Sequence, residues 1–252
     1  MKKVRLFGYE VYGGTMDALV RELVEAVGRR DSVCQASLNV AKLGLCRRSP
    51  AFAATMSEFN LVTADGMSIV LGAALCRARI QERIPGIDLM ARLLDEAEQH
   101  GFSVFFLGAE ASVLERAVAA IRSRHPRLKI AGTRDGFFAP SSEEEVATSI
   151  RSSGADLLFV GMGSPYKEEF LARRRDTLGV HFAMGVGGSF DVWAGLTHRA
   201  PLWIQRVGLE WLYRTLQEPR RLLPRYLRDN MVFVRLLAGE IWNRTYLRQG
   251  HA

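Results

Sequence analysis

The sequence is poor in cysteine and histidine, and neither residue type occurs at a spacing that would bind a metal. Cys34, Cys46 and Cys76 lie far apart, and the five histidines are scattered. A sparse, odd number of cysteines is typical of reduced thiols in an intracellular protein rather than of a disulfide framework. HExxH and Asp-x-Asp motifs are also absent. We therefore expect no required metal and no cofactor.

Long apolar runs are missing as well. No stretch approaches the ~20 consecutive apolar residues that a transmembrane helix needs, and residues 1–14 lack an apolar segment of signal-peptide length. These absences predict a cytosolic protein, which could still bind to the surface of a membrane.

The fingerprints of dinucleotide and nucleotide triphosphate binding are incomplete. The dinucleotide fingerprint GxGxxG needs a third glycine three residues after the second one. That position is Phe190 after Gly185-Val186-Gly187-Gly188 and Tyr166 after Gly161-Met162-Gly163. No Walker A motif occurs either. This argues against the alternative of a nucleotide-binding oxidoreductase. A glycine turn that leads into a helix can still bring backbone N–H groups to a phosphate. A simple tight turn remains an equally good interpretation of each glycine pair.

Short apolar segments alternate with helical patterns through residues 1–190. The expected strands are 4–7, 33–38, 59–63, 103–107, 129–133, 156–160 and 181–186. This alternation predicts an α/β fold with a Rossmann-like, mostly parallel sheet and helices on both faces. Residues 67–77 are apolar on all sides and predict a buried helix.

Polar residues and glycines follow the predicted strands. They are Ser37, Asn39, Asp65, Gly108, Gly136, Gly163, Gly187 and Gly188. Because the carboxyl ends of parallel strands share one edge of a sheet, and ligands bind at that edge, these residues are candidates for a site. For Asp65, followed by Gly66, three roles are open: a general base, a helix N-cap or a turn residue. Ser37 and Asn39 could likewise be ordinary turn residues.

The last quarter of the chain has a different composition. Residues 199–252 contain ten arginines, no lysine and four acidic residues, so they carry +6 of the net charge of +7. Three of the four tryptophans lie there. We expect a core domain at 1–199 and a basic, amphipathic, helical appendage at 200–252, of a kind that can lie in a membrane interface.

Other interpretations of this basic segment remain open. Its arginines alternate with large apolar residues, which argues against nucleic-acid binding. It could instead be a pair of helices that packs on the sheet domain, or part of a non-enzymatic membrane adaptor in which Asp65 would be dispensable.

Several motifs distributed over the chain resemble those of one bacterial family. They are Ser37-Leu38-Asn39, Thr63-Ala64-Asp65-Gly66, Arg83-Ile84-Pro85-Gly86-Ile87-Asp88-Leu89, Phe106-Leu107-Gly108, Gly132-Thr133-Arg134-Asp135-Gly136-Phe137-Phe138, Val160-Gly161-Met162-Gly163-Ser164-Pro165-Tyr166-Lys167-Glu168, Gly185-Val186-Gly187-Gly188-Ser189-Phe190-Asp191, Arg199-Ala200-Pro201, Gly208-Leu209-Glu210-Trp211-Leu212-Tyr213-Arg214 and Gln217-Glu218-Pro219-Arg220-Arg221. Together they resemble the WecG/TagA/CpsF family of glycosyltransferases. Two positions differ: Lys167 stands where the family generally has Gln, and Ser37 where it has Thr.

The resemblance implies a metal-independent, inverting transfer of a sugar from a UDP-sugar to a polyprenyl-diphosphate-linked saccharide. The reaction would occur at the cytoplasmic face of the membrane, in cell-surface polysaccharide synthesis. It implies that Asp65 is the general base, with Ser37 and Asn39 beside it. The implied donor-binding residues are Arg83, Gly108, Gly136, Phe137, Gly163, Lys167, Gly187, Gly188 and Asp191. Those implied for the acceptor and the membrane are Trp211, Arg214, Arg221 and Arg225. The sugar, the acceptor and homo-oligomerisation stay open.

Overall fold

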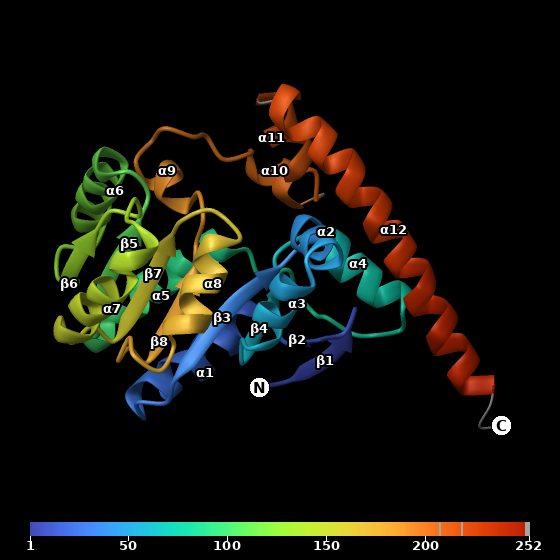
Figure 1. Ribbon diagram of the computed structural model, residues 1–252, viewed down its shortest axis with the longest axis horizontal. Helices are drawn as coiled ribbons and strands as arrows, with labels where there is room; N and C mark the ends of the chain where they lie inside the picture. The colour runs from blue at the N-terminus through green and yellow to red at the C-terminus, as the bar shows by residue number, and fades with distance from the viewer. Residues whose placement is uncertain (207, 218, 250–252) are drawn as a thin grey trace.

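The computed structural model describes residues 1–206, 208–217 and 219–249, without the side chains of 206, 214, 221, 222, 225 and 245–249. Its centre is an eight-stranded sheet with the strand order β1-β2-β4-β3-β8-β7-β5-β6 (Figure 1). Every pairing is parallel except that of β1 with β2. The predicted α/β class with a mostly parallel, Rossmann-like sheet is confirmed.

The strands are short and mostly buried, as expected from their apolar sequences. They are β1 (Lys3–Leu6), β2 (Tyr9–Tyr12), β3 (Val33–Leu38), β4 (Leu61–Ala64), β5 (Ser103–Gly108), β6 (Lys129–Arg134), β7 (Leu157–Gly161) and β8 (Phe182–Gly185). Only β2 was missed from the sequence. Phe7 and Gly8, both at positive φ, form the two-residue turn between β1 and β2. Phe-Gly is not one of the dipeptides that signal such a turn.

The helices lie on both faces of the sheet and enclose two separate apolar cores. One core includes residues of α2 (Val40–Arg48), α3 (Pro50–Ser57), α4 (Met67–Leu75), α7 (Glu143–Ser152) and α8 (Tyr166–Arg174). The other includes residues of α1 (Met16–Gly28), α5 (Gly86–His100), α6 (Ala111–Arg124) and α9 (Ser189–Trp193). Alternate residues of β5 contribute to each core, as the period of a strand requires.

The prediction that residues 67–77 form a buried helix is wrong in its burial. Helix α4 is present, but Leu71 and Leu75 are 59% and 62% exposed. Ile69 and Ala73, on the opposite side of the helix, are fully buried. Helix α4 therefore packs on the sheet through one face and presents an apolar face to the exterior.

The C-terminal segment forms α10 (Leu202–Arg206), α11 (Glu210–Gln217) and the long α12 (Pro219–Gln249). Helix α12 packs against α2, as Figure 1 shows. At this contact the buried Asp229 pairs with Arg48 at 2.7 Å, and a methyl group on Gly44 would lie 2.6 Å from the Asp229 carboxylate. Glycine at 44 thus provides the space that Asp229 occupies.

A second contact holds α12 farther along its length. The ring of Phe233 packs edge-on against Phe7, and a methyl group on Gly72 of α4 would lie 3.1 Å from Phe233. Within the described ranges, none of the helices combines the length and the hydropathy that crossing a bilayer requires. The division into domains at residue 199 stays a prediction.

Candidate active site

Asp65 and Asn39 come together because β4 and β3 are adjacent parallel strands. Leu38 pairs with Ala64 in the sheet, so the two chains leave it side by side. The Asp65 backbone N–H donates to the Leu38 carbonyl at 3.0 Å. Nδ2 of Asn39 donates to Oδ2 of Asp65 at 3.2 Å. The expected grouping of polar side chains at the exits of neighbouring strands is present here.

The structure excludes one of the three roles considered for Asp65. The N-cap residue of α4 is Gly66, and no side chain caps that helix. The N-cap interpretation of Asp65 is therefore wrong. Its partly buried carboxylate instead faces Asn39. A carboxylate held by a side-chain amide, rather than by the backbone of a helix, keeps lone pairs that can accept a proton from a ligand.

Asn39 has two roles, and each uses a different atom of its amide. Oδ1 accepts from the backbone N–H of Lys42 at 3.0 Å and caps α2, which begins at the next residue. Nδ2 is then directed to Asp65. The cap fixes the orientation of the amide, so the start of α2 also fixes the position of the Asp65 carboxylate.

A buried network of charged residues lies beside this pair. Glu168 is 2% exposed, and its Oε1 accepts from Nζ of Lys42 at 2.9 Å, from Nζ of Lys167 at 3.0 Å and from Oγ of Ser164 at 3.1 Å. Lys167 also donates to Ser164. Lys42 additionally donates to Oγ of Ser37 at 3.3 Å. Ser37 is thus joined to Lys167 through the other members of the network.

Burial and the charges of neighbouring side chains together determine the ionisation of this network. Burial and the nearby charge of Lys42 lower the pKa of Lys167, Glu168 and Asp65 raise it, and the net result is a pKa of about 8. Burial would raise the pKa of Glu168, but the two lysines outweigh it and hold that pKa at about 2. The prediction from sequence included Lys167 and missed Lys42 and Glu168. Both lie on helices that pack against the sheet, and charged residues are almost never buried unless they are paired, which the sequence does not show.

The glycines at the other strand exits serve two different purposes. A methyl group on Gly108, which has φ +109°, would lie 2.8 Å from the Gly161 backbone, and one on Gly136 would lie 2.8 Å from Cα of Gly108. These glycines allow the exits of β5, β6 and β7 to pack against each other. Nothing lies within 4 Å of the equivalent point on Gly163 or Gly187. The last two therefore leave open space at the edge of the sheet.

Gly161 offers a direct test of this packing. A methyl group at position 161 would lie 2.2 Å from the ring of Phe190, which is fully buried and packs against Phe106. We expect Gly161→Ala to cost about 1–3 kcal/mol and to lower Tm by roughly 2–4 °C per kcal/mol. Gly28→Ala, where the methyl group would meet nothing within 4 Å, is the control and should leave Tm unchanged or slightly raise it, because alanine favours a helix over glycine. An unchanged Tm for Gly161→Ala would show that Phe190 can move aside.

The other predicted donor-binding residues lie along the same edge. Phe137 follows β6 and is 79% exposed, and its backbone N–H donates to Asp135 at 3.0 Å. Gly188 is the N-cap residue of α9, and Asp191 lies in the first turn of that helix. The Asp191 carbonyl accepts from the N–H groups of Leu196 and Thr197, so at least its backbone has a structural role.

Arg83 lies apart from the glycines and is paired with the C-terminal segment. Its Nη1 lies 3.0 Å from Oε2 of Glu210 in α11, and Glu210 also pairs with Arg199 at 3.3 Å. Arg199 in turn pairs with Asp88 at the start of α5. Ile84 donates to the Ala64 carbonyl at 2.8 Å, which holds this loop against the end of β4, next to Asp65.

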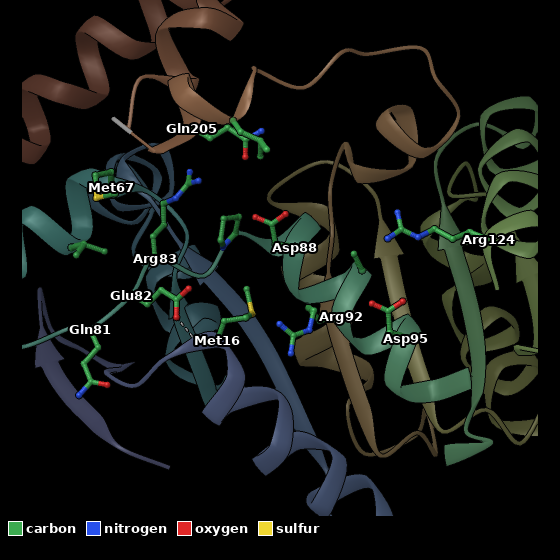
Figure 2. A pocket seen from close by; sticks show the side chains of 14 residues that line it. Met16, Met67, Gln81, Glu82, Arg83, Asp88, Arg92, Asp95, Arg124 and Gln205 are labelled. Carbon is green, nitrogen blue, oxygen red and sulfur yellow. Dashed lines mark hydrogen bonds between the residues drawn. The ribbon is translucent and has the colours of Figure 1, made fainter. Parts of the chain in front are cut away.

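A cleft of about 720 Å³ runs past Arg83. Figure 2 shows Arg83 and Gln205 at one part of this cleft, and Arg92, Asp95 and Arg124 at another. Asp65 is not among the residues that line it. The predicted site is thus divided among the Asp65–Asn39 pair with its charged network, the glycine edge, and Arg83 with its cleft.

The predictions for the C-terminal segment can be followed only in part. Trp211 is 38% exposed, and its ring lies 5.7 Å from that of Tyr226. Arg214 belongs to α11, and Arg221 and Arg225 belong to α12, but the side chains of all three lie outside the described residues. Their predicted contacts with an acceptor or a membrane therefore stay predictions.

Comparison with known proteins extends the resemblance to almost the whole chain. Residues 4–246 match the family described as "Glycosyl transferase WecG/TagA/CpsF family". A Bacillus spizizenii protein named N-acetylglucosaminyldiphosphoundecaprenol N-acetyl-beta-D-mannosaminyltransferase is 37% identical over 174 residues, 69% of this chain and 67% of that protein. A Bacillus subtilis protein of the same name is 36% identical over 166 residues, 66% of this chain and 64% of that protein. The chain spans about two thirds of the length of these relatives.

Proposed function

The chain belongs to the WecG/TagA/CpsF family of glycosyltransferases, and from that premise we propose that it transfers a sugar from a UDP-sugar to a polyprenyl-diphosphate-linked saccharide with inversion at the anomeric carbon. The observation that carries the proposal is the Asp65 carboxylate, which lies at the carboxyl edge of the sheet, does not cap a helix and is oriented by Asn39. Inverting transfer requires a base in such a position.

Asp65 is the general base in this proposal. An acceptor hydroxyl attacks the anomeric carbon from the face opposite UDP, the bond from that carbon to the diphosphate breaks, and Asp65 accepts the hydroxyl proton. Asn39 holds the carboxylate, and Ser37, two residues earlier near the end of β3, contacts the sugar or the acceptor hydroxyl. General-base catalysis of this kind contributes roughly 10²–10⁴-fold to the rate.

The donor binds along the glycine edge. Strands β5 and β7 are neighbours, and the connection from β5 leads to β6 on one side while that from β7 leads to β8 on the other. Ligands of open α/β sheets bind where the connections diverge in this way. In the proposal the open loops at Gly163 and Gly187–Gly188 hold the diphosphate, the exits at Gly108 and Gly136 form the floor, and Phe137 and Asp191 contact the nucleoside.

Protein cations, without a required metal, offset the charge of the leaving UDP. Lys167 supplies one from within the charged network, and Arg83 supplies another from the loop beside β4. Positive groups already fixed at the place where negative charge develops are an effective way to stabilise a transition state.

The C-terminal helices place the enzyme on the cytoplasmic face of a membrane. Among the described residues, most of the exposed large apolar side chains lie in this segment, including Leu202, Trp203, Leu216 and Trp242. Arginines beside apolar residues suit the interface of an anionic bilayer. Trp211, Arg214, Arg221 and Arg225 would then approach the lipid diphosphate of the acceptor.

The names of the two Bacillus relatives suggest the first substrates to test. Purified protein is supplied with a panel of UDP-sugars, beginning with UDP-N-acetylmannosamine, and with a polyprenyl-diphosphate-N-acetylglucosamine mimic, and the release of UDP is measured. We expect one donor to give release that depends on the acceptor and persists in EDTA. If no donor reacted and the protein bound NAD(P), the oxidoreductase interpretation would replace this one. If no donor reacted and the protein only associated with membranes, the adaptor interpretation would replace it.

A further inference from the structure

The network around Glu168 consists of three charged side chains that are almost completely buried, and burying charged groups is unfavourable for stability. Lys42, Lys167 and Glu168 are 6%, 6% and 2% exposed. The Glu168 carboxylate contacts Lys42, Lys167 and Ser164 through Oε1, and Oε2 has no hydrogen-bond partner among the described residues. Buried ion pairs of this kind are rarely better for stability than apolar residues of the same size. Strongly perturbed ionisable groups near a cleft or a reactive carboxylate are instead typical of functional sites.

The network also connects parts of the site that are separate in the sequence. Lys42, on α2, contacts both Ser37 and Glu168. Lys167, on α8, lies within electrostatic range of Asp65, and its stem packs against Gly185 at the end of β8. Glu168 is the residue that both lysines share.

We propose that Lys42 and Glu168 are positioning residues of this active site: together they hold Ser37 and Lys167 in place, and their opposite charges set the protonation state in which Lys167 meets the donor. The inference rests on the proposed function, because only that function gives Lys167 a substrate charge to offset. It assigns roles to two residues that act through Ser37 and Lys167.

The direction of each effect follows from the groups that face Lys167. These are Glu168 on its own helix, Lys42 on α2, Asp65 after β4 and the hydroxyl of Ser164. Cys46 also interacts electrostatically with Lys42 and Glu168, but burial raises the pKa of its thiol, which therefore stays neutral. With a pKa of about 8, Lys167 is an ammonium ion below that pH and loses its charge as the pH rises. Turnover should fall over the same range.

Two substitutions should move this fall in opposite directions. Glu168→Gln removes the negative charge that favours the ammonium form, so the alkaline fall in kcat/KM for the donor should shift to lower pH by roughly one unit. Lys42→Met removes a competing positive charge, so the fall should shift to higher pH by a similar amount. Glu168→Asp keeps the charge and should restore much of the original profile. General damage to the fold would not produce opposite shifts.

A second readout is independent of the substrates. The chain has only five lysines, so ¹³C labelling of lysine and NMR of the full-length protein can follow the titration of Lys167 directly. Its midpoint should be near 8 in the parent protein, lower in Glu168→Gln and higher in Lys42→Met. Lys167→Gln identifies its signal. Asp156→Asn, which alters a hydrogen-bonded pair with Ser103 at the opposite end of the strands, is the control and should shift neither readout.

The two readouts separate the failure of this inference from that of the proposed function. Opposite shifts in both the titration and the pH profile would support the positioning role. Unmoved midpoints, or midpoints that move without a matching shift in turnover, would overturn it. If no UDP-sugar is turned over by the parent protein, the proposed function fails, and so does the positioning role for Lys42 and Glu168 that depends on it.

Discussion

Asp65→Asn is expected to lower kcat by roughly 10²–10⁴-fold while leaving the thermal stability of the protein nearly unchanged. Asparagine has the shape of aspartate, and its oxygen can still accept from Nδ2 of Asn39, which donates to Asp65 at 3.2 Å. What is lost is the capacity to accept a proton from the attacking hydroxyl. The measurement is UDP release under single-turnover conditions, with Tm recorded for the same samples.

The control for this substitution is Asp17→Asn. Asp17 is exposed, and its side chain forms an ion pair with Arg92 at 2.8 Å. Such surface pairs contribute about 0–1 kcal/mol, so kcat should stay at the parent value. Near-normal turnover in Asp65→Asn would eliminate the base and leave only a turn residue at position 65.

Arg83→Gln is expected to lower kcat/KM for the donor by about 10²-fold. Arg83 is mostly buried and, in the proposal, offsets the negative charge that develops on the leaving diphosphate. In the free enzyme its guanidinium is paired with Glu210. Donor binding must therefore compete with a carboxylate from the C-terminal segment.

Two further substitutions separate the charge of Arg83 from its contact with the C-terminal segment. Glu210→Gln removes the competing carboxylate, and because a partly exposed ion pair is worth about 0–1 kcal/mol, KM for the donor should fall by up to roughly fivefold. Arg199→Gln also breaks a contact with Glu210 but leaves Arg83 in place, so its loss should be much smaller than that of Arg83→Gln. If Arg83→Gln and Arg199→Gln lowered kcat/KM equally, Arg83 would only hold the C-terminal segment through Glu210 and would not bind the donor.

Most of the fold could be predicted from the sequence because its strands are short apolar runs whose ends are marked by glycine and polar residues. Strand β2 could not, since its sequence, Tyr9–Tyr12, alternates weakly and its turn uses Phe7 instead of Asn. The exposure of Leu71 and Leu75 was also missed. The apolar sequence of α4 indicates that its side chains favour an apolar environment. It does not show whether the rest of the protein or something outside it provides that environment.

The candidate site could be predicted where it depends on strand exits and not where it depends on helix packing. Asp65 and Asn39 were expected to meet because parallel strands end at one edge, and they do. The approach of Lys42 to Glu168 depends on how α2 and α8 are rotated against the sheet. No periodicity in the sequence specifies that rotation to within the length of a side chain. For the same reason the rejection of Asp65 as a cap required the observed backbone at Gly66.

Helix α2 has contacts at both of its ends, and this has a mechanical consequence. Its first residue follows Asn39, which orients the Asp65 carboxylate, and its last, Arg48, pairs with Asp229 of α12. Roughly two and a half helical turns separate these points. A short helix is stiff, so a force on α12, such as the pull of a lipid surface on its exposed side chains, would be transmitted along α2 as a displacement of the Asp65 carboxylate.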